Sequence, residues 1–173
     1  MQCETKGCSS NAVFHITWVD SRHCKQEQHF CEEHAHQVLT NHDYSIPVGS
    51  GTPAFAAGAR SFDIDVLIIT EAYDQQCVYL HEVGGRRFVP IFIGIFEAAA
   101  LDRHLKGFES PRPLTHDAMA DLIDALHGHL EDVVLSRLED NCYFTDVRIR
   151  QNGELVSVDM RPSDAIILAV IEN

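Results

Sequence analysis

Alternating and helical spacings of hydrophobic residues follow one another along the chain. Residues 62–70, FDIDVLIIT, alternate and end in a wholly apolar run, which predicts a strand with one end buried on both faces. The β-rich runs on either side of Gly84-Gly85 predict a hairpin. Residues 133–160 predict three more antiparallel strands, with turns at 139–141 and 152–153.

Helical patterns occupy three segments of the same region. The first covers residues 95–107 and stops at Gly107. The second starts at Thr115, predicted as its N-cap, and places five apolar residues on one face: Met119, Leu122, Ile123, Leu126 and Leu130. The third follows Pro162 and is predicted to be capped near Ser163. Because strands and helices come in blocks, we predict an α+β fold with a mixed, largely antiparallel sheet and about three helices.

The first 45 residues are rich in cysteine and histidine. Four of the six cysteines lie in the first 31 residues, and six of the eleven histidines lie in the first 42. In a reducing compartment this clustering indicates metal binding before disulfides. Tetrahedral zinc needs four nitrogen or sulfur donors in two short pairs. We therefore predict a structural Zn²⁺ in a small zinc-ribbon or treble-clef-like module, with four ligands: Cys3, Cys8, Cys31 and His34.

Other residues could replace a member of this ligand set. His15, His29 and His36 lie near enough in the sequence, whereas Cys24 belongs to a polar stretch that suggests a hairpin tip and is left out. The alternative to a metal site is a group of buried or reactive thiols. A segment of this size has little core of its own, so a bound metal would supply most of its folding free energy.

Composition divides the chain into three parts. Residues 1–45 form the predicted zinc-binding module, residues 46–61 are rich in Gly, Pro, Ala and Ser and predict a flexible linker, and residues 62–173 form the main domain. No apolar run approaches the roughly 18 residues of a membrane span. The beginning of the chain has no signal-peptide core. We therefore expect a cytoplasmic protein that does not interact with membranes.

Negative charge is concentrated in the main domain. Residues 1–61 contain four Lys/Arg and six Asp/Glu, whereas residues 62–173 contain nine and twenty. Such a domain repels phosphate backbones, so broad electrostatic binding of duplex nucleic acid is disfavoured. A metal-dependent nuclease is still compatible with this charge, because its carboxylates bind the metal and the metal supplies the positive charge.

The cysteine-rich segment resembles the N-terminal module of bacterial protein-arginine-kinase activator proteins. The resemblance rests on the early cysteine pair, on the Ala-x-x-His-x-Thr motif at Ala12–Thr17, and on the segment Phe30–Ala35. His34 occupies the position of the usual fourth cysteine. The resemblance implies a metal-stabilised interaction module, and therefore a protein partner bound through it.

Three motifs of the main domain occur in order: VYLHEVGGRRFVPIFIGIFEAAAL at 78–101, RPLTHDAMADLIDALHG at 112–128, and VDMRPSDAIILA at 158–169. Together they resemble the bifunctional nuclease (DUF151) family. The family implies an α+β domain that self-associates, so a homo-oligomer is expected. Plant members of the family are described as acting on both DNA and RNA.

Six polar residues of these motifs are candidates for a site: Glu97, His116, Asp117, Asp159, Arg161 and Asp164. In the catalytic interpretation the four acids bind Mg²⁺ or Mn²⁺, and His116 acts as general acid or base. In the structural interpretation the acids are partners of helix N-termini. A buried Arg161 then pairs with Glu97 or Asp117, and its removal costs about 3–5 kcal/mol. Both interpretations require residues 115–117 and 159–164 to converge.

Two functional hypotheses follow. The first is a metal-dependent nuclease of low sequence specificity that acts on single-stranded DNA or RNA and uses its zinc module to bind a partner. The alternative is a non-enzymatic, oligomeric regulatory or scaffold protein that recruits a partner through the same module. The net charge of −13 and the lack of a basic groove in the sequence favour the second hypothesis.

Overall fold

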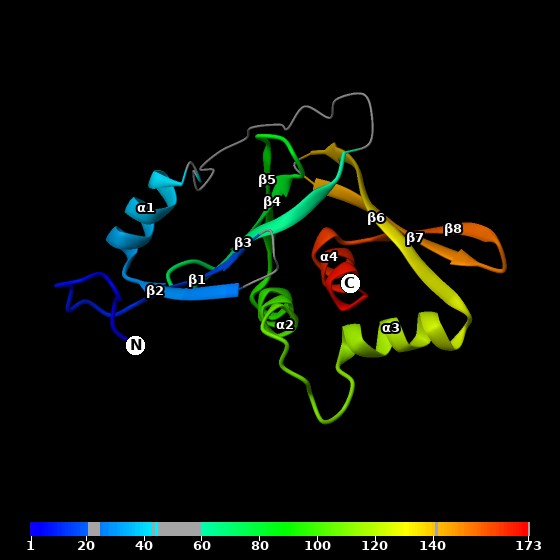
Figure 1. Ribbon diagram of the computed structural model, residues 1–173, viewed down its shortest axis with the longest axis horizontal. Helices are drawn as coiled ribbons and strands as arrows, with labels where there is room; N and C mark the ends of the chain where they lie inside the picture. Colours follow the sequence, from blue (N-terminus) through cyan, green and yellow to red (C-terminus); the bar gives the residue numbers. More distant parts are fainter. Residues whose placement is uncertain (21–24, 43, 45–59, 141, 173) are drawn as a thin grey trace. The chain divides into compact units, whose positions relative to one another are not determined.

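The structure is a computed structural model that describes residues 1–20, 25–42, 44, 60–140 and 142–172 (Figure 1). The chain divides into two compact units, Met1–Ala98 and Ala99–Asn173, which are described separately below. The described residues form antiparallel sheets and four helices, which confirms the predicted α+β class. None of the described helices has the length and apolar character that crossing a bilayer requires.

The first unit contains a five-stranded antiparallel sheet with the strand order β2-β1-β3-β4-β5 (Figure 1). Helix α1, Glu32–Asn41, follows the second strand, and helix α2, Ile95–Leu105, begins at the end of this unit. The strands are β1 Phe14–Val19, β2 Lys25–Phe30, β3 Phe62–Thr70, β4 Gln76–Glu82 and β5 Phe88–Ile93.

Strand β1 joins residues on both sides of the predicted linker. It pairs with β2 on one side and with β3 on the other, where Phe14 faces Thr70 and Ile16 faces Ile68. The hairpin of the cysteine-rich segment therefore extends the sheet that starts at Phe62. The predicted linker, residues 46–61, lies outside the described residues except for Arg60 and Ser61. The domain boundaries stay a prediction.

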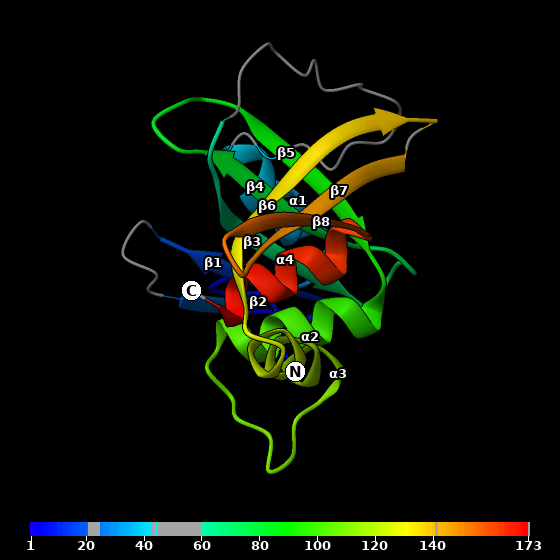
Figure 2. The same ribbon diagram turned by 90° about the vertical axis from the view of Figure 1, so that its right-hand side faces the viewer.

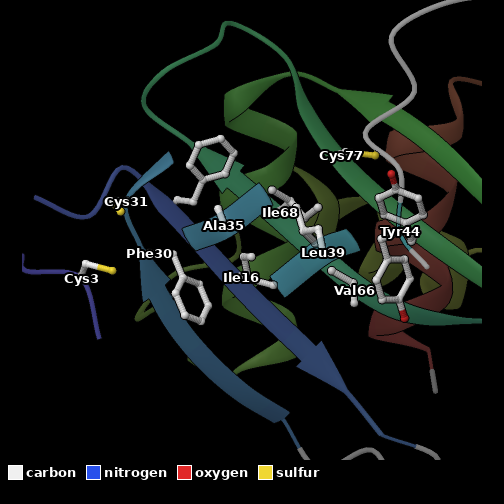
Figure 3. Close-up of a cluster of buried hydrophobic side chains, with 12 residues drawn as sticks. Cys3, Ile16, Phe30, Cys31, Ala35, Leu39, Tyr44, Val66, Ile68 and Cys77 are labelled. Carbon is white, nitrogen blue, oxygen red and sulfur yellow. The ribbon is translucent and has the colours of Figure 1, made fainter. Parts of the chain in front are cut away.

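A hydrophobic core lies between α1 and the sheet of the first unit (Figure 3). Alternation along β1 directs Phe14 and Ile16 to this core, and α1 contributes Ala35 and Leu39, one helical turn apart. Burying each large side chain of this kind stabilises the unit by roughly 1.5–3 kcal/mol. Cys3 and Cys31 lie together at one end of the core, so packing holds this pair of thiols in place.

The second unit contains a three-stranded antiparallel sheet in the order β6-β7-β8, with helix α4, Pro162–Ile171, against it (Figure 2). Ala165 of α4 packs with Leu130 of β6 and Val147 of β7. Helix α3, Thr115–Ala125, and the end of α2 complete the unit. The strands are β6 Gly128–Glu139, β7 Cys142–Gln151 and β8 Glu154–Met160.

The predicted single apolar face from Met119 to Leu130 was wrong. Helix α3 ends at Ala125, because His127 adopts a left-handed backbone with φ of 59° that cannot continue an α-helix. Gly128 then begins β6, and a Cβ there would lie 2.9 Å from Cγ2 of Ile149. Leu130 is consequently buried on a strand, whereas Leu126 is 65% exposed.

Candidate functional site

The four predicted metal ligands come together in the first unit. The ligand atoms of Cys3, Cys8, Cys31 and His34 all lie within 4.8 Å of one another. The two sulfur atoms of Cys8 and Cys31 are 3.9 Å apart, and His34 Nδ1 lies 3.5 Å from Cys3 Sγ and 3.1 Å from Cys31 Sγ. Tetrahedral zinc bonds imply about 3.8 Å between two sulfurs and about 3.5 Å between sulfur and nitrogen. The quartet could therefore hold a metal ion of this kind.

A tight turn and a helix start position these ligands. The turn between Cys3 and Cys8 is closed by a hydrogen bond from the Cys8 N–H to the Thr5 carbonyl, with Gly7 at φ of 86°. Cys31 is the N-cap of α1, and His34 lies in the first turn of that helix. Hairpin β1-β2 connects the two pairs, which is the order of elements in a treble clef.

Hydrogen bonds adjust the acidity of the two buried thiols in opposite directions. Burial alone would raise the pKa of Cys3, but backbone hydrogen bonds with Cys31 and Thr5 and a side-chain bond to His34 lower it to about 6. For Cys31, the backbone hydrogen bond with His34 lowers the pKa, yet burial and the thiols of Cys3 and Cys8 outweigh it and raise the value. Cys3 is therefore the thiol that ionises first. Metal ligation requires such a thiolate.

The second group of candidate residues surrounds the starts of α3 and α4 in the second unit. The predicted caps were wrong: Leu114 is the N-cap of α3, and Arg161 is the N-cap of α4. Each helix instead has an aspartate as its third residue, and in α3 the Asp117 carboxylate accepts a hydrogen bond of 2.7 Å from the Leu114 N–H. The two similar sequence segments thus have similar local structures.

Residues 115–117 and 159–164 meet through His116 and Asp164, which confirms their predicted convergence. His116 Nε2 lies 2.9 Å from Asp164 Oδ1, and Arg161 binds the same carboxylate through Nε at 2.7 Å and Nη2 at 3.2 Å. Burial raises the pKa of Asp164, but the hydrogen bonds from Arg161 and His116 outweigh burial and lower it. Asp164 is therefore an ionised carboxylate whose two oxygens both accept hydrogen bonds.

Asp117 forms a second ionic group with residues at the end of α2. Its Oδ1 lies 3.1 Å from His104 Nε2, and its Oδ2 lies 3.6 Å from Arg103 Nη2. Burial and the charge of Arg103 lower the pKa of His104, and the opposing effect of Asp117 is smaller. Arg103 Nη2 is also 2.9 Å from His104 Nε2. Since one ring nitrogen cannot donate and accept at once, the tautomer decides whether His104 binds Asp117 or accepts from Arg103.

The remaining candidates differ from these residues in position or in exposure. Asp159 is exposed at the end of β8, opposite Asp146 of β7. Glu97 lies in the first turn of α2, in the first unit. Arg161 was predicted to be buried, but its side chain is 67% exposed because it precedes the helix at the surface. Its predicted contact with Glu97 or Asp117 stays a prediction.

Sequence reasoning missed Arg103 and His104 as members of the site. The available signal was the basic pair in the last turn of a predicted helix, a position where cations interact favourably with the helix dipole. The favourable interaction with the helix dipole explains such a pair without any role in a site. Nothing in the spacing indicates that the two side chains reach Asp117 across the loop that precedes α3.

Comparison with known proteins adds a family and two relatives. A family described as the bifunctional nuclease domain matches residues 78–173. Two proteins of Mycobacterium tuberculosis, from strains CDC 1551 / Oshkosh and H37Rv, are both described as uncharacterized and are each 37% identical to this chain over 102 residues. The match covers 59% of this chain and 60% of each relative. The chain therefore spans less than two thirds of the length of these relatives.

Proposed function

The chain belongs to the bifunctional nuclease domain family, and from this premise we propose that it hydrolyses phosphodiester bonds of single-stranded DNA or RNA with low sequence specificity. The observation that supports an active site is the contact between His116 and Asp164 at the meeting point of two helix starts. Histidine is the side chain most often used for proton transfer near neutral pH. A carboxylate that holds one ring nitrogen fixes the orientation and tautomer of the ring.

In this proposal His116 transfers the proton and Asp164 positions it. The hydrogen bond between Nε2 and Asp164 Oδ1 leaves Nδ1 as the nitrogen that exchanges a proton with the attacking water or the leaving oxygen. The His116 side chain is only 13% exposed, so a substrate can contact it only through the exposed edge of the ring. Proton transfer by a positioned histidine typically contributes about 10²–10⁴-fold to the rate.

Arg161 is the group that we propose contacts the phosphate. Its guanidinium is two-thirds exposed and is held in orientation by two hydrogen bonds to Asp164. A planar guanidinium matches the oxygens of a phosphodiester. The N-terminus of α4, which starts at the next residue, favours the same negative charge.

The predicted Mg²⁺ or Mn²⁺ site does not follow from these contacts. A hard cation needs several carboxylate or carbonyl oxygens. Both oxygens of Asp164 accept hydrogen bonds from Arg161 or His116, and those of Asp117 face the Leu114 N–H, Arg103 and His104. A catalytic divalent ion therefore stays a prediction, with four proposed ligands: Glu97, Asp117, Asp159 and Asp164. Its test is the cleavage rate of chelated protein compared with that of metal-supplemented protein.

For the N-terminal quartet, we propose a structural Zn²⁺ bound by Cys3, Cys8, Cys31 and His34. The support is the agreement between the sulfur and nitrogen separations and tetrahedral zinc geometry. The ion would link the first turn of the chain to the start of α1, which stabilises a surface for binding a protein partner. We expect this surface to serve recruitment and not the reaction.

One observation favours the non-enzymatic alternative. Asp117 and Asp164 each have an arginine and a histidine neighbour within the second unit, an arrangement that also serves only to hold two helix starts together. In that case the domain is an oligomeric scaffold, and the zinc module supplies its specificity.

Cleavage of fluorescently labelled single-stranded DNA and RNA distinguishes the two functions. We would compare the wild-type chain with His116→Gln, Asp164→Asn and His129→Gln, the last of which alters an exposed histidine on β6. The nuclease proposal predicts a rate at least about 10²-fold lower for His116→Gln and no change for His129→Gln. Equal cleavage by all four proteins would indicate a contaminating nuclease. No cleavage by the wild type, with EDTA, Mg²⁺ or Mn²⁺, would support the scaffold.

A further inference from the structure

A second cluster of potential metal ligands lies on the hairpin of the first unit, formed by different residues from the cysteine quartet. His15 Nδ1 is 2.8 Å from His29 Nδ1, and ligand atoms of His15, Glu27 and His29 all lie within 4.8 Å of one another. Glu71 Oε1 lies 3.9 Å from the other ring nitrogen of His15, Nε2. Two imidazoles and the Glu27 carboxylate therefore gather around one point of the sheet, and Glu71 faces the opposite side of the His15 ring.

Strand register explains why these four residues share one face. His15 on β1 faces His29 on β2, and Thr17, two residues further, faces Glu27. Residues two apart on a strand point to the same side of the sheet. On the other flank His15 faces Ile69 of β3, so Glu71 lies on that same side, and its N–H bonds the Val13 carbonyl.

We propose that His15, His29 and Glu27 form a second site, for a divalent transition metal of the zinc type, and that Glu71 is an outer-sphere carboxylate at the other ring nitrogen of His15. Imidazole selects ions of borderline softness such as Zn²⁺, Cu²⁺ and Ni²⁺, and carboxylates complete such sites. The absence of sulfur in this set distinguishes it chemically from the quartet of Cys3, Cys8, Cys31 and His34, to which thiolates contribute three ligands.

The geometry needs only a small adjustment to accept the ion. Two imidazoles bound to one tetrahedral zinc have their nitrogens about 3.3 Å apart. The present separation of 2.8 Å is that of a hydrogen bond, in which one ring donates and the other accepts. Replacing the shared proton by a metal requires the nitrogens to move apart by roughly half an ångström. His15 and His29 are both partly exposed, so side-chain rotation can supply this movement.

The consequence of occupancy is a cross-link between two strands. The ligands come from β1 and from β2, so the ion would fasten the two strands of the hairpin to each other. An ion that binds only the folded form raises stability with its free concentration. The site therefore makes the stability of this hairpin depend on the supply of metal.

Metal counting tests the proposal on the full chain. Metal-free protein is loaded with Zn²⁺, separated from unbound ion and measured by elemental analysis, for the wild type, His29→Gln, Glu27→Gln and the control His129→Gln. We expect about two zinc ions per chain for the wild type and the control, and about one for His29→Gln. Glu27→Gln should lower the affinity for the second ion by at least about 10-fold. Loss of an outer-sphere partner already costs this much, and Glu27 is proposed as a ligand.

A readout on the unmodified protein covers the case in which a variant does not fold. Nuclear magnetic resonance of the imidazole groups should show His15 and His29 shifting with the second equivalent of Zn²⁺, after His34 has shifted with the first. A single zinc ion in the wild type, a second ion retained by folded His29→Gln, or unshifted His15 and His29 resonances would each overturn the proposal. None of these outcomes bears on the nuclease proposal, because none of the test variants changes His116, Arg161 or Asp164.

Discussion

Asp164→Ala should destabilise the second unit far more than loss of one negative charge explains. The Asp164 side chain is 16% exposed, and it accepts hydrogen bonds from His116 and Arg161. Loss of the bond to the poorly exposed His116 costs about 1–3 kcal/mol, since the imidazole keeps its burial and loses its partner. The exposed ion pair with Arg161 adds about 0.2–1 kcal/mol. The lost interaction with the α4 N-terminus adds about 0.3–1 kcal/mol.

The three contributions sum to about 1.5–5 kcal/mol, and because they belong to one network they are not strictly additive. Asp159→Ala is the matched control, because it removes the same charge from an exposed position on β8 five residues earlier and should change stability by less than about 0.5 kcal/mol. Arg161→Ala should cost only about 0.2–1 kcal/mol, since its guanidinium is exposed.

The assay must observe the second unit specifically. The only tryptophan, Trp18, belongs to the first unit, so its fluorescence is not a specific probe of the second. Amide hydrogen exchange of β7 and α4, followed by mass spectrometry, gives the free energy of opening of the segment in question. Equal protection of these segments in Asp164→Ala and Asp159→Ala would refute the reasoning.

The pH dependence of this difference has a definite sign. The pKa of Asp164 is lowered in the folded state, so its contribution is fully present above the unfolded value and is lost as pH falls through the folded value. The protection difference between the wild type and Asp164→Ala should therefore be constant near neutral pH. It should shrink below about pH 4, the unperturbed aspartate value.

Two further predictions concern the first unit and the core of the second. Cys31→Ser should reduce the zinc content by about one ion per chain in elemental analysis, and hydrogen exchange should show β1 and β2 less protected, because folding free energy of such modules comes largely from the metal. A protein with full zinc content after this substitution would contradict the ligand assignment. Thr145 is fully buried, and its hydroxyl has no hydrogen-bond partner among the described residues. Thr145→Val should thus be neutral or stabilising by up to about 1 kcal/mol in urea unfolding, and a loss above this size would reveal a partner for the hydroxyl.

Local chemistry explains which features were predictable from the sequence. The zinc quartet follows from ligand type and spacing, both of which are local, and the strands follow from alternation over six to ten residues. The pairing of β1 with β3 joins Phe14 to Thr70, and no local pattern specifies a contact over that separation. The end of α3 was missed because a histidine, and not a glycine, adopts the left-handed conformation at position 127.

The helix starts show the same limit at the level of single residues. Thr115 and Ser163 are good N-caps by type, yet each lies inside its helix. Pro162 fits the first turn without needing a donor, and this fixes the N-cap of α4 at Arg161, two residues earlier than hydroxyl preference suggests. The aspartates at the third positions then supply the acceptors. The contact of Asp164 with His116 depends on the packing of two helices, whereas Arg161 lies only three residues before Asp164 in the sequence.

Ion pairs between basic side chains and carboxylates also limit how this acidic domain can bind a nucleic acid. Of its nine Lys/Arg, seven lie within 4.0 Å of a carboxylate: Arg87, Arg103, Lys106, Arg137, Arg148, Arg150 and Arg161. Each pair is close to neutral at a distance, so the domain has little long-range attraction for phosphate. Recognition of DNA or RNA would then depend on short-range contacts at the helix starts, where Arg161 and the N-terminus of α4 act together. Binding of that kind releases few counterions and is weak but tolerant of salt, which fits a low-specificity nuclease better than a protein that stays bound to its nucleic acid.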